Sequence, residues 1–114
     1  MYEKLNESMN DVSGGVVNRW GEIVWPVTSV PEILELALTN NWIVLGGDIL
    51  TLEQEYTHDN WYFTPNPQKP LSDNVQASVE KCRQFISQYV NKNGDKFLFV
   101  FSISNSFIEG KLGF

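Results

Sequence analysis

The stretch Trp42-Ile43-Val44-Leu45-Gly46-Gly47-Asp48-Ile49-Leu50 decides how this chain folds. Its large apolar residues run on without alternation, which is typical of a strand buried on both faces. Such a strand needs helices or loops on either side to cover it. The two glycines predict a β-bulge or a close approach of another backbone. Asp48 follows them, where a carboxylate at the rim of a sheet can face outward.

A helix is predicted on each side of this strand along the chain. Ser29 can cap the first helix, Pro31 suits its first turn, and the helical pattern ends at about Asn40. The second helix begins at Ser72-Asp73 and ends at Asn93-Gly94. Its apolar stripe recurs at intervals of four and three residues and consists of Val75, Val79, Cys82, Ile86 and Tyr89. Both patterns are those of helices packed on a sheet.

Further strands are predicted at residues 61–64 and 96–103, which are rich in β-forming and apolar side chains. His58-Asp59-Asn60 predicts a turn before the first of them. Residues 16–26 are either irregular or a short strand, and Pro26 argues against a central strand there. The first twelve residues show a weak helical pattern, and the tail after Ser104 is expected to pack against the body. Together these patterns predict an α+β fold. It would be a small, mainly antiparallel sheet of three to five strands covered by two main helices, in a single domain over residues 1–114.

Composition restricts the classes of protein to which the chain can belong. The 114 residues include one cysteine, so no disulfide can form within the chain. The first residues are polar and lack the apolar core of a signal peptide. No apolar run approaches the roughly 20 residues that a membrane span needs. We therefore expect a soluble, cytoplasmic protein that does not insert into a membrane.

The charge is negative overall and unevenly distributed. The net charge is -6, and no lysine or arginine occurs between Arg19 and Lys69. An acidic surface attracts a cationic partner and repels nucleic acid and anionic membranes. The simpler interpretation is a solvated acidic surface that keeps the protein soluble.

The sequence offers few groups for catalysis or metal binding. The only histidine, His58, lies beside Asp59, and with Asp48 it could form the site of a small hydrolase. Cys82, the only thiol, falls on the apolar stripe of a helix and is expected to be a core residue. Without a second histidine or a cysteine pair, a zinc site lacks ligands. We expect no catalytic residues, no metal and no cofactor.

Aromatic residues surrounded by carboxylates favour a protein-binding surface instead. Trp42 and Trp61 are expected in the core, whereas Trp20 and Trp25 lie in irregular sequence and are expected to be partly exposed. The predicted partner-binding residues are Trp20, Glu22, Trp25, Glu32, Glu35, Glu53, Glu55 and Asp59.

The chain also resembles a known family. The Gly46-Gly47-Asp48 motif, followed by Asn60-Trp61-Tyr62, a helix carrying Ser78 and an apolar strand, is similar to the immunity protein 40 family of bacterial polymorphic toxin systems. The resemblance covers about residues 30–101. It implies a small α+β cytoplasmic protein, encoded beside a toxin, that binds and neutralises that toxin without catalysis or cofactor. The motif residues Gly46, Gly47, Asp48, Asn60 and Trp61 are expected to be structural, with Asp48 accepting hydrogen bonds at the Asn60 turn.

Three alternatives therefore remain, and the structure can separate two of them. A hydrolase requires that Asp48, His58 and Asp59 converge in a pocket. A toxin-binding module requires an exposed acidic and aromatic face, directed at a cognate protein toxin with a basic surface. The third alternative is a self-associating structural protein, a homodimer formed through the aromatic N-terminal region.

Overall fold

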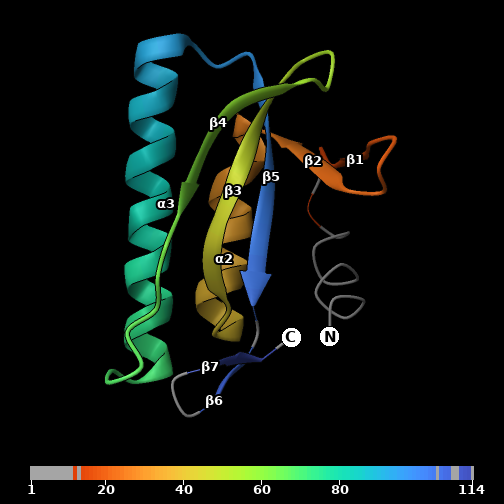
Figure 1. Ribbon diagram of the computed structural model, residues 1–114. Coiled ribbons are helices and arrows are strands. Elements are labelled where there is room, and N and C mark those ends of the chain that lie inside the picture. The colour runs from red at the N-terminus through yellow and green to blue at the C-terminus, as the bar shows by residue number, and fades with distance from the viewer. Residues whose placement is uncertain (1–11, 13, 105, 109–110, 114) are drawn as a thin grey trace.

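The computed structural model describes residue 12, residues 14–104, and the backbone of residues 106–108 and 111–113. Two helices and a five-stranded antiparallel sheet with the order β1-β2-β5-β3-β4 make up most of this part of the chain (Figure 1). This arrangement confirms the predicted α+β class. In chain order the elements are β1 (Val16–Val17), β2 (Ile23–Pro26), the short 3-10 helix η1 (Val27–Ser29), α2 (Val30–Asn40), β3 (Ile43–Thr51), β4 (Tyr56–Tyr62), α3 (Leu71–Asn93), β5 (Phe97–Ser104), β6 (Ser106–Ile108) and β7 (Lys111–Gly113).

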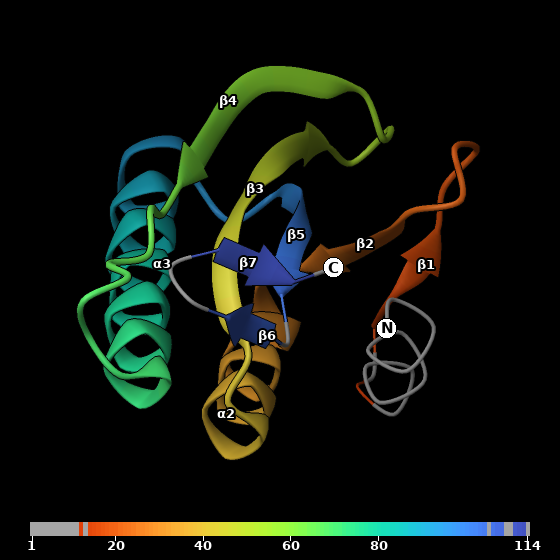
Figure 2. The ribbon, with the colours of Figure 1, turned by 60° about the horizontal axis from the view of Figure 1, so that its bottom comes forward.

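The helices α2 and α3 cover one face of the sheet (Figure 2). The main core lies between the sheet and this helix layer, and it contains Ile33 from α2, Val79 from α3, and Ile49 and Phe99 from the sheet. Within the described part of the chain, no helix covers the other face, which we call the open face. A small second cluster of Val24, Leu50 and Val100 there is built from strand residues alone.

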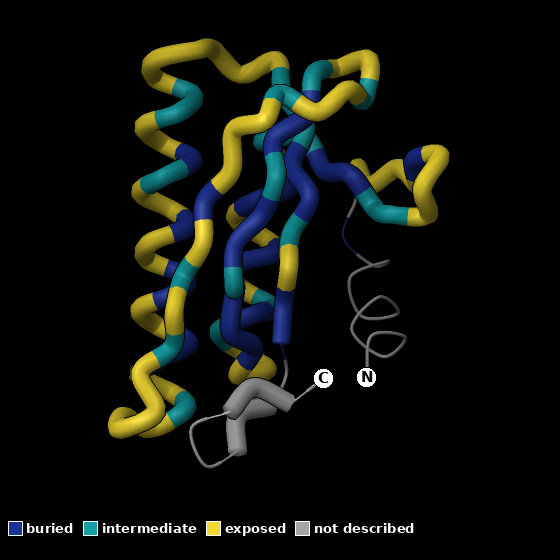
Figure 3. Tube along the Cα trace, in the orientation of Figure 1, coloured by how far each residue is buried: buried dark blue, intermediate teal, exposed yellow. Residues whose placement is uncertain are grey.

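β3 is the central strand, with β5 on one side and β4 on the other. It is almost continuously buried (Figure 3), as its apolar run predicts. The pairing register with β5 shifts between Val44 and Gly46, which confirms a bulge at the glycine pair. Gly46 has a φ of +147°, and a Cβ atom on Gly47 would lie 2.2 Å from the carbonyl oxygen of Val100. The glycines are therefore needed for both conformation and close approach.

A buried serine connects the bulge to the helix layer. Ser78 on α3 is fully buried, and its Oγ accepts a hydrogen bond of 2.9 Å from the Val44 N–H. The same hydroxyl donates to the Val75 carbonyl oxygen at 2.9 Å. An unpaired backbone N–H would be costly in the core, so Ser78 stabilises the irregular point of β3.

Both helices form where their end signals predict. In α2, Pro31 lies in the first turn, although the Ser29 side chain does not cap it, and Asn41 ends the helix with a left-handed φ of 55°. In α3, the stripe from Val75 to Ile86 is buried and Gly94 follows the last helical residue. Side-chain periodicity therefore identified both helices and the face that each one buries.

Two predictions about the strands are wrong. His58-Asp59-Asn60 is not a turn but part of β4, and the chain reverses instead at residues 52–55, where the Thr51 N–H donates to Glu55 at 2.8 Å. The turn-like composition reflects an edge strand exposed to water, and His58 has a φ of +70° beside an irregularity in the pairing with β3. The second concerns Pro26, because β2 lies between β1 and β5 in the sheet. Pro26 is the last residue of β2 and pairs with Leu98 of β5 but with no residue of β1, so the missing N–H interrupts no ladder toward β1.

Two predictions concern the ends of the chain. The weak N-terminal helix falls on residues outside the described part, apart from the buried Val12. At the other end the backbones of β6 and β7 pair as a two-stranded antiparallel sheet. The predicted packing of the tail side chains also lies outside the described residues.

Candidate functional site

The open face is the most chemically distinctive surface of the described chain. Successive side chains of a strand point to opposite faces, so Asp48, Asn60 and Tyr62 share the open face while Ile49 and Trp61 point to the helices. A shallow hollow of about 350 Å³ lies here, and Gly46, Gly47, Asp48, Asn60, Tyr62 and Ser102 are among its lining residues. Tyr62 is 72% exposed, which is unusual for a large aromatic side chain on a strand.

A structured loop holds two further residues at this face. The Asn18 side chain is buried, and its Oδ1 accepts hydrogen bonds of 2.9 Å from the backbone N–H groups of both Trp20 and Glu22. The Glu22 carboxylate in turn accepts a hydrogen bond from the Tyr56 hydroxyl. The Trp20 and Tyr56 rings lie 5.3 Å apart, centroid to centroid. Asn18 therefore fixes a loop that joins an exposed tryptophan and a carboxylate to β4.

The electrostatics of this face are dominated by carboxylates. Partial burial and the negative charge of Glu22 raise the pKa of Asp48 above its ordinary value of 3.8. The hydrogen bond to Glu22, followed by burial, raises the pKa of Tyr56 to about 12, so its hydroxyl remains a donor. Within the described residues the only salt bridge joins Arg83 to Glu80 on α3, so no salt bridge neutralises Glu22 or Asp48.

Two cations lie over aromatic rings of this face, one from the loop between β1 and β2 and the other from α3. The Arg19 guanidinium lies 4.4 Å from the Trp20 ring centroid, and the Lys81 ammonium lies 5.4 Å from that of Tyr62. Both distances fall within the range of cation–π attraction. The rings of Trp20 and Tyr62 therefore each attract a cationic side chain of the chain itself.

The predicted partner-binding residues do not form one surface. Trp20 and Glu22 lie at the open face, and Glu53 and Glu55 lie at residues 52–55, where the chain reverses between β3 and β4. The other predicted residues lie elsewhere: Glu32 and Glu35 on α2 in the helix layer, Asp59 turned toward α3, and Trp25 in the core.

The expectation that Trp25 is exposed is wrong. It is 2% exposed and pairs with Phe99 across the β2–β5 ladder. The sequence before Pro26 looks irregular, but the strand pairing places Trp25 on the helix side of the sheet. A buried tryptophan cannot contact a partner directly, so its role is in the core.

The motif residues have structural contacts. Trp61 is 5% exposed and stacks on Phe85 of α3 at 5.2 Å, which confirms its predicted place in the core, and Trp42 is 6% exposed. Asp48 and Asn60 are paired in register on neighbouring strands, so no Asn60 turn exists for Asp48 to hold. Asp48 is therefore free to present its carboxylate on the open face.

The hydrolase arrangement is absent from the described residues. Asp48 lies on the open face, whereas Asp59 accepts a 2.8 Å hydrogen bond from the Tyr89 hydroxyl on the helix side. The two carboxylates therefore point to opposite faces of the sheet and cannot converge with His58 in one pocket. No group of three metal-binding side chains is found in the described part of the chain. Burial raises the pKa of the Cys82 thiol to about 12, which leaves it unreactive in the core.

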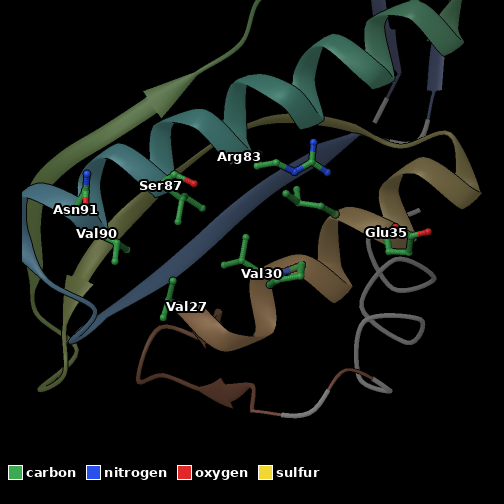
Figure 4. A pocket seen from close by; sticks show the side chains of 10 residues that line it. Val27, Val30, Glu35, Arg83, Ser87, Val90 and Asn91 are labelled. Atoms are coloured by element: carbon green, nitrogen blue, oxygen red, sulfur yellow. The ribbon is translucent and has the colours of Figure 1, made fainter.

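The helix layer, on the other side of the sheet, has a groove of about 550 Å³ between α2 and α3 (Figure 4). Val27 and Val30 line it on one side, and Ser87 and Val90 line it on the other. Its lining is mainly aliphatic and contains no constellation suited to catalysis. No helix in the described residues is both long and apolar enough to cross a membrane.

Sequence reasoning missed some residues that build the open face. Tyr56 is absent from the predicted partner-binding residues, yet its hydroxyl donates a hydrogen bond to the Glu22 carboxylate. Asn18 had a recognisable signal, because an asparagine shortly before a glycine favours a turn closed by its own side chain. The partnership of Glu22 and Tyr56 had no local signal, since 34 residues separate them.

A comparison with protein families identifies this chain. The family described as immunity protein 40 matches residues 11–103, which is most of its length. No curated protein and no solved structure matches the chain. The chain therefore belongs to the immunity protein 40 family.

Proposed function

We propose that this member of the immunity protein 40 family neutralises a cognate bacterial toxin by binding it through the open face of the sheet. Membership of the family supports an immunity role and a toxin partner. The binding surface, which we call the acidic aromatic patch, consists of Trp20, Glu22, Asp48, Tyr56 and Tyr62, with Glu53 and Glu55 beside it. It works in the cytoplasm of the toxin-producing cell, within a polymorphic toxin system, and requires neither catalysis nor cofactor.

The observation that carries this proposal is a sheet face that no helix of the described residues covers. Its carboxylates form no salt bridge with any other described residue. The raised pKa of Asp48 has burial as its main cause and the charge of Glu22 as its second. A cationic side chain from a partner would relieve that repulsion, and it would find aromatic rings beside the carboxylates. Partly exposed tryptophan and tyrosine side chains are the residues that most often anchor protein interfaces.

A cationic partner also agrees with the charge of the whole chain. The net charge of -6 accelerates encounter with a basic surface and disfavours nucleic acid as the direct ligand. A toxin that acts on nucleic acid would carry such a basic surface, and the acidic aromatic patch would compete for it.

The test compares two matched charge reversals. Glu53→Lys with Glu55→Lys changes four charge units beside the acidic aromatic patch, whereas Glu32→Lys with Glu35→Lys makes the same change on α2. Binding would be measured at low and high salt against the toxin domain encoded by the neighbouring reading frame, in a catalytically inactive form. We expect the first pair to slow association at low salt by roughly tenfold and the α2 pair to have little effect. Equal effects of the two pairs, or none from either, would contradict the proposed location.

A further inference from the structure

β4 lies at the edge of the five-stranded sheet and pairs with β3 alone. Figure 1 shows it at the border of the sheet beside α3, and no other strand of the described chain lies along its outer side. An edge strand presents unpaired N–H and C=O groups, to which another strand can pair. Many proteins protect such an edge with lysine or proline, but the segment Asp59-Asn60-Trp61-Tyr62 contains neither.

The register identifies the backbone groups that point outward. The Phe63 N–H donates to the Leu45 carbonyl oxygen at 2.8 Å, so these two residues form a hydrogen-bonded pair. Facing residues of antiparallel strands alternate between hydrogen-bonded and non-hydrogen-bonded pairs. Trp61 therefore bonds to Gly47, whereas Asn60 and Tyr62 occupy non-hydrogen-bonded positions. Their N–H and C=O groups face the free edge, about 7 Å apart along the strand.

A hollow next to β4 leaves space for the side chains of an added strand. It measures about 330 Å³ and lies between Asp59 and Asn60 of β4 and the second half of α3. Its α3 side presents Phe85 and Tyr89 beside the polar Gln88, Lys92 and Asn93. This mixed lining can receive apolar as well as polar side chains.

We infer that an extended segment of the toxin adds to β4 as a sixth strand of the sheet, pairing its backbone with Asn60 and Tyr62. This inference rests on the proposed function, because the occupant is the toxin. Alternate side chains of the added strand enter the hollow beside α3, and the others lie next to Tyr62 at the acidic aromatic patch. The edge and the patch thus form one continuous surface, since the side chains of Asn60 and Tyr62 belong to the open face.

A second copy of the chain is a less suitable occupant. Two copies paired edge to edge would bring together molecules that each carry a net charge of -6. A toxin with a basic surface meets the same edge with attraction in place of repulsion. Charge complementarity therefore favours a different protein over self-pairing.

The experiment removes one outward N–H without removing the strand. Asn60→Pro deletes that donor at a non-hydrogen-bonded edge position, where proline is tolerated. Asn60→Ala is the matched control, because it loses the same side chain and keeps the N–H. Binding to the inactive toxin domain is expected to weaken about tenfold in the proline variant and less than about threefold in the alanine variant. Equal losses in both variants would overturn the inference.

Amide hydrogen exchange gives a second measurement that does not depend on a variant. In the unmodified chain, bound to the inactive toxin domain, exchange at the Asn60 and Tyr62 amides should slow by at least about tenfold. A toxin that binds while these amides exchange unchanged would refute strand addition and leave the proposed function intact. A toxin domain that does not bind at all would refute the proposed function itself. Slowing of these amides in the chain alone, increasing with concentration, would identify a second copy as the occupant and would also overturn the inference.

Discussion

Replacing Gly47 by alanine tests how closely the strands approach at the bulge. The new Cβ atom would lie 2.2 Å from the carbonyl oxygen of Val100 on β5 and 2.6 Å from the Trp61 ring. Both distances are far inside van der Waals contact. One obstacle is backbone in the middle of the sheet and the other is a buried indole packed on Phe85, so neither can move away easily.

The expected cost follows from these contacts. Overpacking a well-filled core by even one methyl group costs about 1–3 kcal/mol. Because β3 is paired on both sides, we place Gly47→Ala at the upper end, about 3 kcal/mol. Small domains are stable by only about 5–15 kcal/mol, so this is a large fraction of the total. Gly21→Ala provides a comparison, since Gly21 has a φ of +81° and nothing within 4 Å of the added atom. It should cost only the penalty that an L-residue pays for a left-handed backbone conformation, about 1 kcal/mol.

Urea unfolding followed by tryptophan fluorescence measures both variants. For a slope of about 1–3 kcal/mol per molar urea, Gly47→Ala should lower the midpoint by about 1–3 M, and Gly21→Ala by about a third of that. The slopes should stay unchanged, so that the midpoints report stability. If Gly47→Ala unfolds within about 0.2 M of the unmodified chain, the close approach of β3 and β5 is incorrect.

Three further predictions concern the side chains of Ser78, Asp48 and Cys82. Ser78→Ala leaves the backbone N–H at the bulge unpaired in the core and should cost about 1–3 kcal/mol by urea unfolding, whereas Ser87→Ala on the exposed face of α3 should be nearly neutral. In the folded chain, burial and then the charge of Glu22 raise the pKa of Asp48 above 3.8. Between pH 3.8 and this raised pKa, Asp48 stays protonated in the folded chain and is ionised in the unfolded chain. Asp48 therefore lowers stability as the pH rises through the folded pKa. Asp48→Asn should match the unmodified chain below pH 3.8 and become more stable than it toward neutral pH; the opposite trend in urea midpoints would contradict this. Cys82, with a pKa of about 12, should resist a thiol reagent in the folded chain and react fully in denaturant, and rapid labelling of the folded protein would show that α3 packs differently.

The sequence determined the elements that depend on neighbouring residues. Helical periodicity and end signals located α2 and α3, because the contacts that set a helix and its buried stripe lie within a few residues. The apolar run with its glycine pair located the central strand and its bulge. The motifs also pointed to the family to which the chain belongs.

The extent of the edge strand β4 could not be predicted from the sequence. β4 is polar because one side of it faces water, so its residues resemble those of a turn. Only the pairing with β3 shows that His58, Asp59 and Asn60 are extended. Composition could not distinguish an exposed edge strand from a loop.

The tertiary structure alone decided which residues share a surface. In a strand, a shift of one residue moves every side chain to the other face, so the face depends on the pairing partner and not on the local sequence. Pairing with β5 buried Trp25 in the core, and pairing with β3 turned Asp59 toward α3. The same pairing left Asp48 on the open face, near Glu22. The sequence supplied the carboxylates and aromatic residues, but the register of the sheet selected those that form the acidic aromatic patch, because register is a contact between residues far apart in the chain.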